Sequence, residues 1–329
     1  VLDGEFIVGW YNNPKHELQG KTFQRARRST DFWNWSELEI IQDTGNEKGL
    51  MYVGLQFLTL DGKLYCFTNQ EKGSERPTQC LLQVWKPEEK KWEILGPIAD
   101  KFLSMQAPIL LENGNFIISG SLMPPTRDIN GTTPVVFISQ GKEIQKPWRM
   151  VRLDPKTDYV NVFAETAITE DGENILAVTR LEHSPFPNFY ESRDFGETWR
   201  KIENRTFAAS SSKFAAGTFS NGYRYIIYNL PDFQRDENGK IFVKRNTEGN
   251  PTTEGIGMGR GTLVMALARP GEKAFSKIWK VSDVTASTQQ KASHYPCVLE
   301  HDGMIYIVYT GQHGLRNCGL TRFPLKSIE

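Results

Sequence analysis

Apolar runs separated by Asp-Gly or Asn-Gly pairs recur along the whole chain. Such a pair between two β-rich runs is a strong hairpin signal, because these residues tolerate the positive φ angles of a tight turn. Each pair here is followed by a β-type run, such as Leu64-Tyr65-Cys66 after Asp61-Gly62. The pattern predicts six antiparallel hairpins, with turns at Asp3-Gly4, Asp61-Gly62, Asn113-Gly114, Asp171-Gly172, Asn221-Gly222 and Asp302-Gly303.

The spacing of these turns indicates a repeat. The glycines at positions 4, 62, 114, 172, 222 and 303 stand 58, 52, 58, 50 and 81 residues apart. A period of about 50 residues with several short strands per repeat is typical of a propeller blade. We therefore predict an all-β fold, a six-bladed β-propeller of four-stranded antiparallel sheets in a single domain, residues 1–329. The long fifth interval predicts an insertion in the fifth blade, covered by the polar stretch from Pro231 to Gly259.

The first blade differs from the others in this pattern. Only Val1 and Leu2 precede its turn, whereas the other turns have an inner strand before them. We expect that an N-terminal inner strand of this blade is missing from the sequence. Because Val1 is not a natural start, we also expect that a leader has been removed, which favours a secreted or periplasmic protein.

The run Ser192-Arg193-Asp194-Phe195-Gly196-Glu197-Thr198-Trp199 reads Ser-x-Asp-x-Gly-x-Thr-Trp. Its short polar side chains can bond backbone amides inside a turn, and its glycine can take a backbone angle that side chains resist. Its tryptophan can pack between neighbouring sheets. The run predicts a tight turn between the two outer strands of a small sheet.

This run resembles the Asp box of bacterial-neuraminidase repeats, which occur in β-propellers of the sialidase superfamily. The resemblance implies a sialidase-like six-bladed propeller. Weaker copies occur near the expected place in other repeats, at Ser29-Thr30-Asp31 with Trp33 and Trp35, from Trp85 to Trp92, and from Ser139 to Trp148.

Composition and charge exclude several classes of protein. Lys+Arg and Asp+Glu both number 39, so the formal net charge is zero and a general binder of nucleic acid is not expected. No apolar run reaches the roughly 20 residues of a membrane span. No glycine-rich phosphate loop or metal-ligand spacing stands out, so we expect no cofactor and no metal. We expect a monomer that binds a glycan.

The four cysteines give no metal or disulfide framework. Cys66 and Cys80 could face each other across a hairpin, whereas Cys297 and Cys318 are expected on strands too far apart to bridge. We expect all four to be buried thiols.

The loops that enter each inner strand and leave each second strand of a propeller converge at one end of its axis, where a ligand site forms. These positions are polar and rich in Arg and His. They are Asn12, Asn13, Lys15, His16, Glu17, Asn69, Glu71, Ser104, Gln106, Arg127, Asp128, Glu165, Arg180, Glu182, His183, Ser211, Lys213, Asn229, Arg260, His294, Tyr295, Gln312, His313 and Arg316.

Four of these residues match the sialidase pattern in order and repeat: Glu165, Arg180, Arg260 and Tyr295. The resemblance implies that the two arginines bind the carboxylate of an acidic sugar, as planar guanidinium groups do in bidentate fashion. It implies that Tyr295 attacks the anomeric carbon in a retaining mechanism while Glu165 takes its proton, because a phenol needs a base at neutral pH.

The chain departs from the sialidase pattern in two places. The third arginine of sialidases belongs to the first inner strand, which this sequence lacks. The loop that carries their Asp acid/base holds none here, so we expect His16 or Glu17 to act instead. Gln106, Arg127, His294 and His313 complete the expected substrate-binding set.

We therefore expect a sialidase-like glycoside hydrolase that removes a terminal acidic sugar. Two alternatives stay open. One is an exo-acting hydrolase or lyase on another polysaccharide, such as an arabinan or a glycan of rhamnose or uronic acid. The other is a non-catalytic carbohydrate-binding propeller, because fold alone does not decide chemistry.

Overall fold

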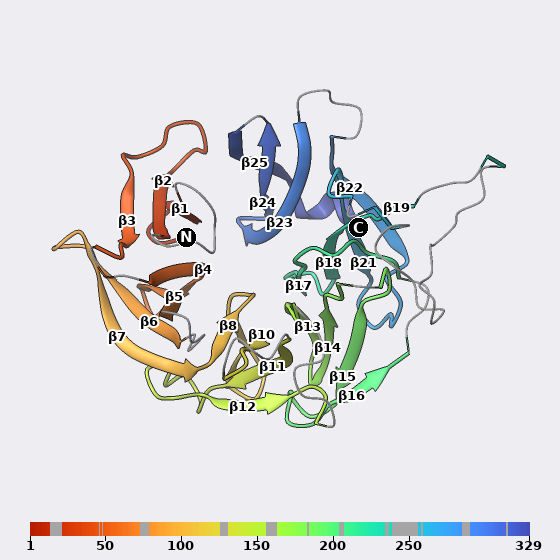
Figure 1. Ribbon diagram of the computed structural model, residues 1–329, viewed down its shortest axis with the longest axis horizontal. Coiled ribbons are helices and arrows are strands. Elements are labelled where there is room, and N and C mark those ends of the chain that lie inside the picture. Colours follow the sequence, from red (N-terminus) through yellow and green to blue (C-terminus); the bar gives the residue numbers. More distant parts are fainter. Residues whose placement is uncertain are drawn as a thin grey trace. The chain divides into compact units, whose positions relative to one another are not determined.

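The structure is a computed structural model of the 329-residue chain. It describes all residues except 14–21, 46, 48, 73–78, 126–130, 156–162, 183, 204–206, 234–236, 239–255, 258, 285–289 and 314. The chain divides into two compact units, Val1–Val160 and Asn161–Glu329. The strands of both units pair in antiparallel fashion, mostly with their neighbours in the sequence, which is the arrangement of propeller blades (Figure 1).

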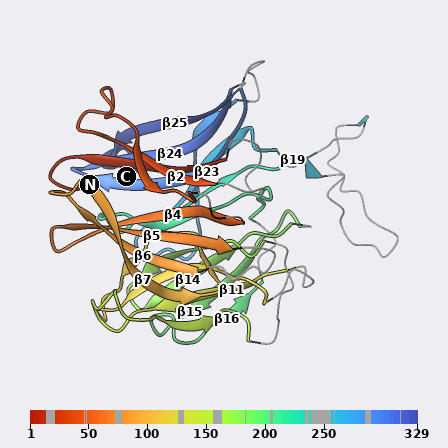
Figure 2. The ribbon, with the colours of Figure 1, turned by 60° about the vertical axis from the view of Figure 1, so that its left-hand side comes forward.

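Three sheets follow one another in the first unit. Figures 1 and 2 show the four strands β4 to β7 side by side as the most extended of these sheets. The strands are β1 (Phe6–Asn12), β2 (Phe23–Ser29) and β3 (Glu39–Gln42); then β4 (Leu50–Leu60), β5 (Lys63–Lys72), β6 (Gln79–Lys86) and β7 (Lys91–Asp100); then β8 (Phe102–Ser104), β9 (Ile109–Leu110), β10 (Phe116–Leu122), β11 (Thr133–Ile138) and β12 (Arg149–Arg152).

The second unit also contains three large sheets, with a small pair of strands at the base of the insertion. The strands are β13 (Thr166–Asp171), β14 (Asn174–Thr179), β15 (Asn188–Ser192) and β16 (Arg200–Ile202); then β17 (Ala215–Thr218), β18 (Arg224–Asn229), β21 (Thr262–Ala268) and β22 (Lys277–Asp283), with β19 (Asp232–Phe233) paired to β20 (Ile256–Gly257); then β23 (Gln290–His301), β24 (Met304–His313) and β25 (Leu315–Pro324), followed by the short helix η2 (Leu325–Ile328).

All six predicted Asx-Gly pairs lie in turns that lead into the predicted strands, so the repeat is confirmed. At Asp61-Gly62 the φ angles are 49° and 70°, and at Asp302-Gly303 they are 49° and 68°. Two successive positive φ angles are what the tightest hairpin turns require. The predicted insertion is also confirmed, because β18 pairs with β21 across the segment that holds β19 and β20.

The Asp-box turn joins β15 to β16, the two outer strands of their sheet, as predicted. The Ser192 hydroxyl accepts a bond from the Gly196 amide at 2.8 Å, and the Asp194 carboxylate accepts one from the Thr198 amide at 2.9 Å. Gly196 has a φ of 86°. The indole of the half-buried Trp199 donates to the Gly196 carbonyl at 2.9 Å. The side chains of the motif thus replace backbone hydrogen bonds inside the turn.

Two of the four cysteines contradict the expectation of buried thiols. Cys297 and Cys318 are exposed, whereas Cys66 and Cys80 are buried, and all four are free. Cys66 lies opposite Gln83, so Cys66 and Cys80 do not face each other across the β5–β6 ladder. Burial raises the pKa of both buried thiols to about 12, so they behave as small apolar side chains.

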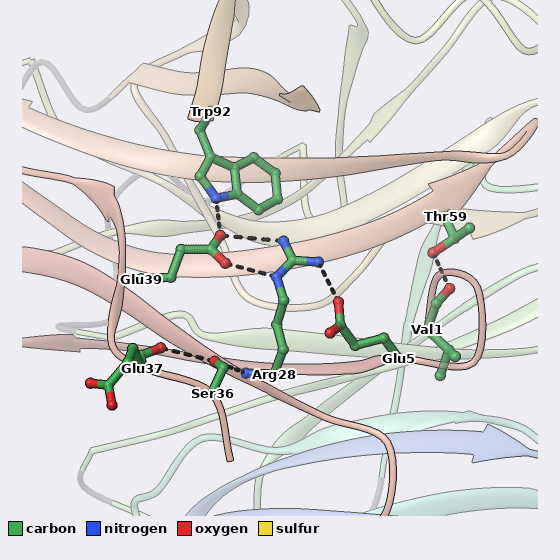
Figure 3. A network of polar contacts seen from close by, with 8 residues as sticks. All are labelled: Val1, Glu5, Arg28, Ser36, Glu37, Glu39, Thr59 and Trp92. Atoms are coloured by element: carbon green, nitrogen blue, oxygen red, sulfur yellow. Dashed lines mark hydrogen bonds and ion pairs between the residues drawn. The ribbon is translucent and has the colours of Figure 1, made fainter. Parts of the chain in front are cut away.

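A polar network ties the first hairpin of the chain to the next sheet in the first unit (Figure 3). The Arg28 guanidinium on β2 donates to Glu39 at 2.7 Å and to Glu5 at 3.1 Å. The Trp92 indole on β7 donates to the same Glu39 carboxylate, and the guanidinium lies 4.3 Å from the centroid of the Trp85 ring. The Arg28 side chain is only 10% exposed, and its single positive charge is compensated by Glu5 and Glu39.

We expect Arg28→Met to lower the free energy of unfolding by about 3 kcal/mol, because it leaves the mostly buried Glu39 carboxylate without its cation. Urea denaturation measures the loss. The matched control is Lys86→Met, which breaks the exposed ion pair with Glu93 and should cost under about 1 kcal/mol. Equal losses in the two variants would show that the Arg28 network does not hold the unit together.

The second unit contains a carboxyl group that should make stability depend on pH. Burial raises the pKa of Glu170, in β13, to about 7, against which the Arg224 charge acts only weakly. One Glu170 carboxyl oxygen is buried with no hydrogen-bond partner among the described residues. The folded state therefore holds this proton more tightly than the unfolded state, where the pKa is 4.5.

The stability contributed by this proton is fully present below pH 4.5 and is lost as the pH rises through 7. Glu170→Gln should therefore narrow the difference in unfolding free energy between pH 5 and pH 8 by up to about 3 kcal/mol. Urea denaturation at the two pH values tests this, with the exposed Glu173→Gln in the same hairpin as the control. An unchanged pH dependence in Glu170→Gln would contradict the assignment.

Candidate functional site

Glu165 and Arg180 are brought together by the first hairpin of the second unit. Glu165 directly precedes β13 and Arg180 directly follows β14, and the Arg180 amide donates to the Glu165 carbonyl at 2.9 Å. This bond continues the ladder one step beyond the Thr166–Thr179 pair. Side chains at directly opposed positions of an antiparallel ladder lie on the same face, so the carboxylate and the guanidinium meet.

Arg180 is the centre of a buried ionic network. Its guanidinium donates to the Glu165 carboxylate at 2.7 Å, to the Glu182 carboxylate at 3.2 Å and to the Ser211 hydroxyl at 2.9 Å. The Ser211 hydroxyl in turn donates to Glu182 at 2.9 Å. The Phe163 ring lies against the guanidinium, with 4.7 Å between the guanidinium carbon and the ring centroid. The network therefore joins the β13–β14 hairpin to the loop before β17.

The balance of charge keeps Arg180 a cation. Only 6% of its side chain is exposed, and burial alone would lower its pKa. The attraction and hydrogen bond of Glu165, with the charge of Glu182, outweigh burial and raise the pKa of Arg180 above its usual value. The carboxylates keep some access to solvent, with 15% of the Glu165 side chain and 18% of the Glu182 side chain exposed.

Arg260 and Tyr295 form the second half of the site. Arg260 lies between β20 and β21, and its carbonyl accepts a bond from the Ser293 amide of β23 at 2.7 Å. Its guanidinium donates to the Tyr295 hydroxyl at 3.4 Å and to the Ser211 carbonyl at 3.1 Å. The guanidinium carbon also lies 5.2 Å from the centroid of the Tyr295 ring. Both arginines of the predicted site thus contact Ser211.

Tyr295 is held in an unusual backbone conformation. The register of β23 on β24 shifts between His294 and Cys297, and Tyr295 has a φ of 56°. Pro296 has no amide hydrogen to donate to the ladder, which favours a bulge at this point. A bulky residue with positive φ is strained and persists only where the surrounding structure holds it. The bulge re-aims Tyr295 towards Arg260.

The structure contains no hydrogen bond between Tyr295 and Glu165, the residues that the resemblance implies as nucleophile and base. Among the described residues, Glu165 is bonded through its carboxylate to Arg180, and the Tyr295 hydroxyl is bonded to Arg260. The two halves of the site are joined through Ser211, which accepts a bond from each arginine. Glu165 binds Arg180 instead, because a guanidinium binds a carboxylate more strongly than a neutral phenol does.

The other predicted site residues are placed as follows. His294 is buried, and its ring stacks on Tyr295 with 4.5 Å between centroids. Gln106 lies in the first unit and accepts a bond from Ser119 at 3.4 Å. His313 ends β24, but its side chain is outside the described part of the chain. His16, Glu17 and Arg127 also lie outside the described residues, so their roles stay predictions.

Two residues of the network, Glu182 and Ser211, were only members of the broad polar set in the sequence. Their sequence signal is their position, one in the loop after Arg180 and the other in the loop before β17. Glu182 lies in the β14–β15 loop, and its ion pair forms because this loop brings it back to Arg180 at the buried end of β14. The spacing of residues in the sequence does not reveal such a contact. Both residues belong to the site because both contact Arg180.

Within the described ranges, no cluster of three or more His, Cys, Asp or Glu side chains could hold a metal ion. No helix in the part of the chain that the structure describes is long and apolar enough to cross a membrane.

Comparison with known proteins places this chain in a family. The model of the BNR repeat-like domain matches residues 24–307, which is most of the chain. The chain belongs to the BNR repeat-like domain family. A search of curated proteins finds no match.

Solved structures show the fold of this BNR repeat-like protein. The Hadza microbial sialidase Hz136 matches 98% of the chain with a TM-score of 0.69 at 13% sequence identity. Trypanosoma rangeli sialidase in complex with sialic acid matches 99% of the chain with a TM-score of 0.64 at 14% sequence identity. The match covers 64% and 53% of those two sialidases, so this chain spans less than two thirds of their length. A Dyadobacter fermentans protein of unknown function matches 98% of the chain with 0.68 at 12% identity, over 92% of its own length.

These likenesses confirm the predicted fold class, an all-β, sialidase-like six-bladed β-propeller. Among the described residues, two of its six sheets, β1–β3 and β23–β25, contain three strands rather than the expected four.

Proposed function

We propose that this protein is a glycoside hydrolase that removes a terminal sugar by a retaining mechanism with Tyr295 as the nucleophile. The observation that carries the proposal is the position of the Arg260 guanidinium, which contacts both the hydroxyl and the ring face of Tyr295 on a strained bulge. A fixed cation beside a phenol stabilises the negative charge that the oxygen develops as it attacks.

The first step forms a bond between the Tyr295 oxygen and the anomeric carbon and breaks the bond from that carbon to the leaving oxygen. The phenolic proton passes to Glu165, directly or through one water, and an acid donates a proton to the leaving group. In the second step water attacks the anomeric carbon, and the Tyr295 oxygen leaves and regains a proton. His16 or Glu17 is the proposed acid/base.

Glu165 is bonded to Arg180 rather than to Tyr295, and this arrangement is compatible with its proposed role as the base. Catalytic hydrogen bonds are often long or absent before substrate binds and tighten in the complex. Glu165 keeps one carboxyl oxygen outside its bond to Arg180, and its side chain is partly exposed. That oxygen is the proposed proton acceptor.

The likeness to sialidases supports catalysis on a glycan, because two of the solved structures that share this fold are sialidases, one of them in complex with sialic acid. The identities of 13% and 14% are too low to carry a sugar across to this chain. A non-catalytic, glycan-binding propeller is the competing proposal, and it requires no reactivity at Tyr295.

We expect the protein to hydrolyse at least one member of a panel of 4-methylumbelliferyl glycosides that covers sialic acid, uronic acids, rhamnose, arabinose and common hexoses. Tyr295→Phe should lower kcat/KM by at least about 100-fold, and Glu165→Gln by about 100-fold or more. Fluorophore release measures both, with circular dichroism to verify the fold.

The matched control is Tyr223→Phe, which changes a buried tyrosine beside the Asn221-Gly222 turn, directly before β18. This variant should keep wild-type kinetics. Turnover that survives intact in Tyr295→Phe would exclude the proposed nucleophile. Binding of glycans without turnover of any would favour the non-catalytic propeller.

A further inference from the structure

We infer that Glu182 determines the specificity of this site, and that it makes the site select a terminal sugar without a carboxylate. This inference rests on the proposed function, because it names the substrate class of the same site. It also changes the expectation from the sequence, where two arginines in sialidase-like positions pointed to an acidic sugar.

Three of the five N–H donors of the Arg180 guanidinium bond protein oxygens, and two of those oxygens belong to carboxylates. Each of its three nitrogens donates to a protein oxygen, one on Glu165, one on Glu182 and one on Ser211. The Ser211 hydroxyl also donates to Glu182, which closes a ring of three contacts around one side of the guanidinium. A carboxylate ligand binds a guanidinium through two parallel N–H bonds. Here such a ligand would share each terminal nitrogen with a protein carboxylate, Glu165 on one and Glu182 on the other.

Arg260 binds Tyr295 rather than a carboxylate. One terminal nitrogen donates to the Tyr295 hydroxyl and the other to the Ser211 carbonyl. When Tyr295 loses its proton, the Arg260 charge is the one that compensates the phenolate. The Arg260 charge therefore serves the phenolate during the reaction, and Arg180 already faces two carboxylates.

The charges of the site lead to the same conclusion. Arg180 and Arg260 contribute two positive charges, and Glu165 and Glu182 contribute two negative charges, so the four side chains sum to zero. An acidic sugar would bring an uncompensated anion beside two partly buried carboxylates, which is unfavourable in a site screened from water. A neutral sugar offers hydroxyl groups, which are donors that the outer carboxylate oxygens of Glu165 and Glu182 can accept.

Glu182 is the residue on which this balance depends. Without its charge, the site has one surplus cation, and an Arg180 nitrogen loses a partner that binds it strongly. Glu182→Gln should therefore open the site to carboxylates while Glu165, Tyr295 and Arg260 stay in place. Glu182→Asp keeps the charge and should retain the exclusion of acidic ligands.

The test is binding of DANA, the inhibitor bound to Trypanosoma rangeli sialidase in a structure that shares this fold, measured by isothermal titration calorimetry. We expect Glu182→Gln to bind DANA at least about tenfold more tightly than the wild type, because one repulsive charge has gone. Glu182→Asp and the control Glu173→Gln, an exposed carboxylate in the β13–β14 turn, should bind as weakly as the wild type.

Equal DANA affinity in the wild type and in folded Glu182→Gln would overturn the inference. A second measurement needs no variant: wild-type protein that hydrolyses the 4-methylumbelliferyl α-sialoside faster than every neutral glycoside would overturn it as well. The proposed hydrolase fails separately, if no glycoside is cleaved while the gain of DANA binding in Glu182→Gln is still observed.

Discussion

The candidate site depends on one buried cation, Arg180. A guanidinium with 6% of its side chain exposed is tolerated only when acceptors surround it. Glu165, Glu182 and Ser211 supply those acceptors from three different segments of the second unit. Because each partner is fixed by the same cation, Arg180 sets both the arrangement of the carboxylates and the charge that a ligand meets. The second arginine, Arg260, is joined to this arrangement through the Ser211 carbonyl.

The fold separates the devices that stabilise the sheets from those that carry chemistry. In the hairpin of β13 and β14, the Asp171-Gly172 turn lies at one end, and Glu165 and Arg180 lie at the other. The Asp box joins the outer strands β15 and β16, and its polar side chains satisfy their own turn. The strained residue Tyr295 lies on the inner strand β23, where a bulge before Pro296 directs it to Arg260. The ladder is regular from Cys297 to His301, so the sheet that follows the bulge can hold the strained residue.

Features that depend on local chemistry could be predicted from the sequence. The Asx-Gly turns and the Asp box are of this kind, because a turn type demands particular residues within a few positions. Glu165, Arg180, Arg260 and Tyr295 were predicted from a pattern shared with sialidases, and the structure places them in two contacting pairs. The hydrogen-bond partners of these residues could not be predicted. Glu165 binds Arg180 rather than Tyr295, and this depends on side chains from separate loops. The exposure of Cys297 and Cys318 was missed because the period of a strand does not show which face is covered.

Tyr295 is the proposed nucleophile, and trapping the covalent intermediate tests this role most directly. The protein would be incubated with a panel of 2-fluoro glycosyl fluorides of neutral sugars and with 2,3-difluorosialic acid, then digested and analysed by mass spectrometry. We predict that a neutral fluorosugar labels the peptide that contains Tyr295, with the label on the phenolic oxygen. The Tyr295→Phe variant should carry no label. A label on Glu165 or Glu182 would contradict it and would make the carboxylates around Arg180 the reacting groups.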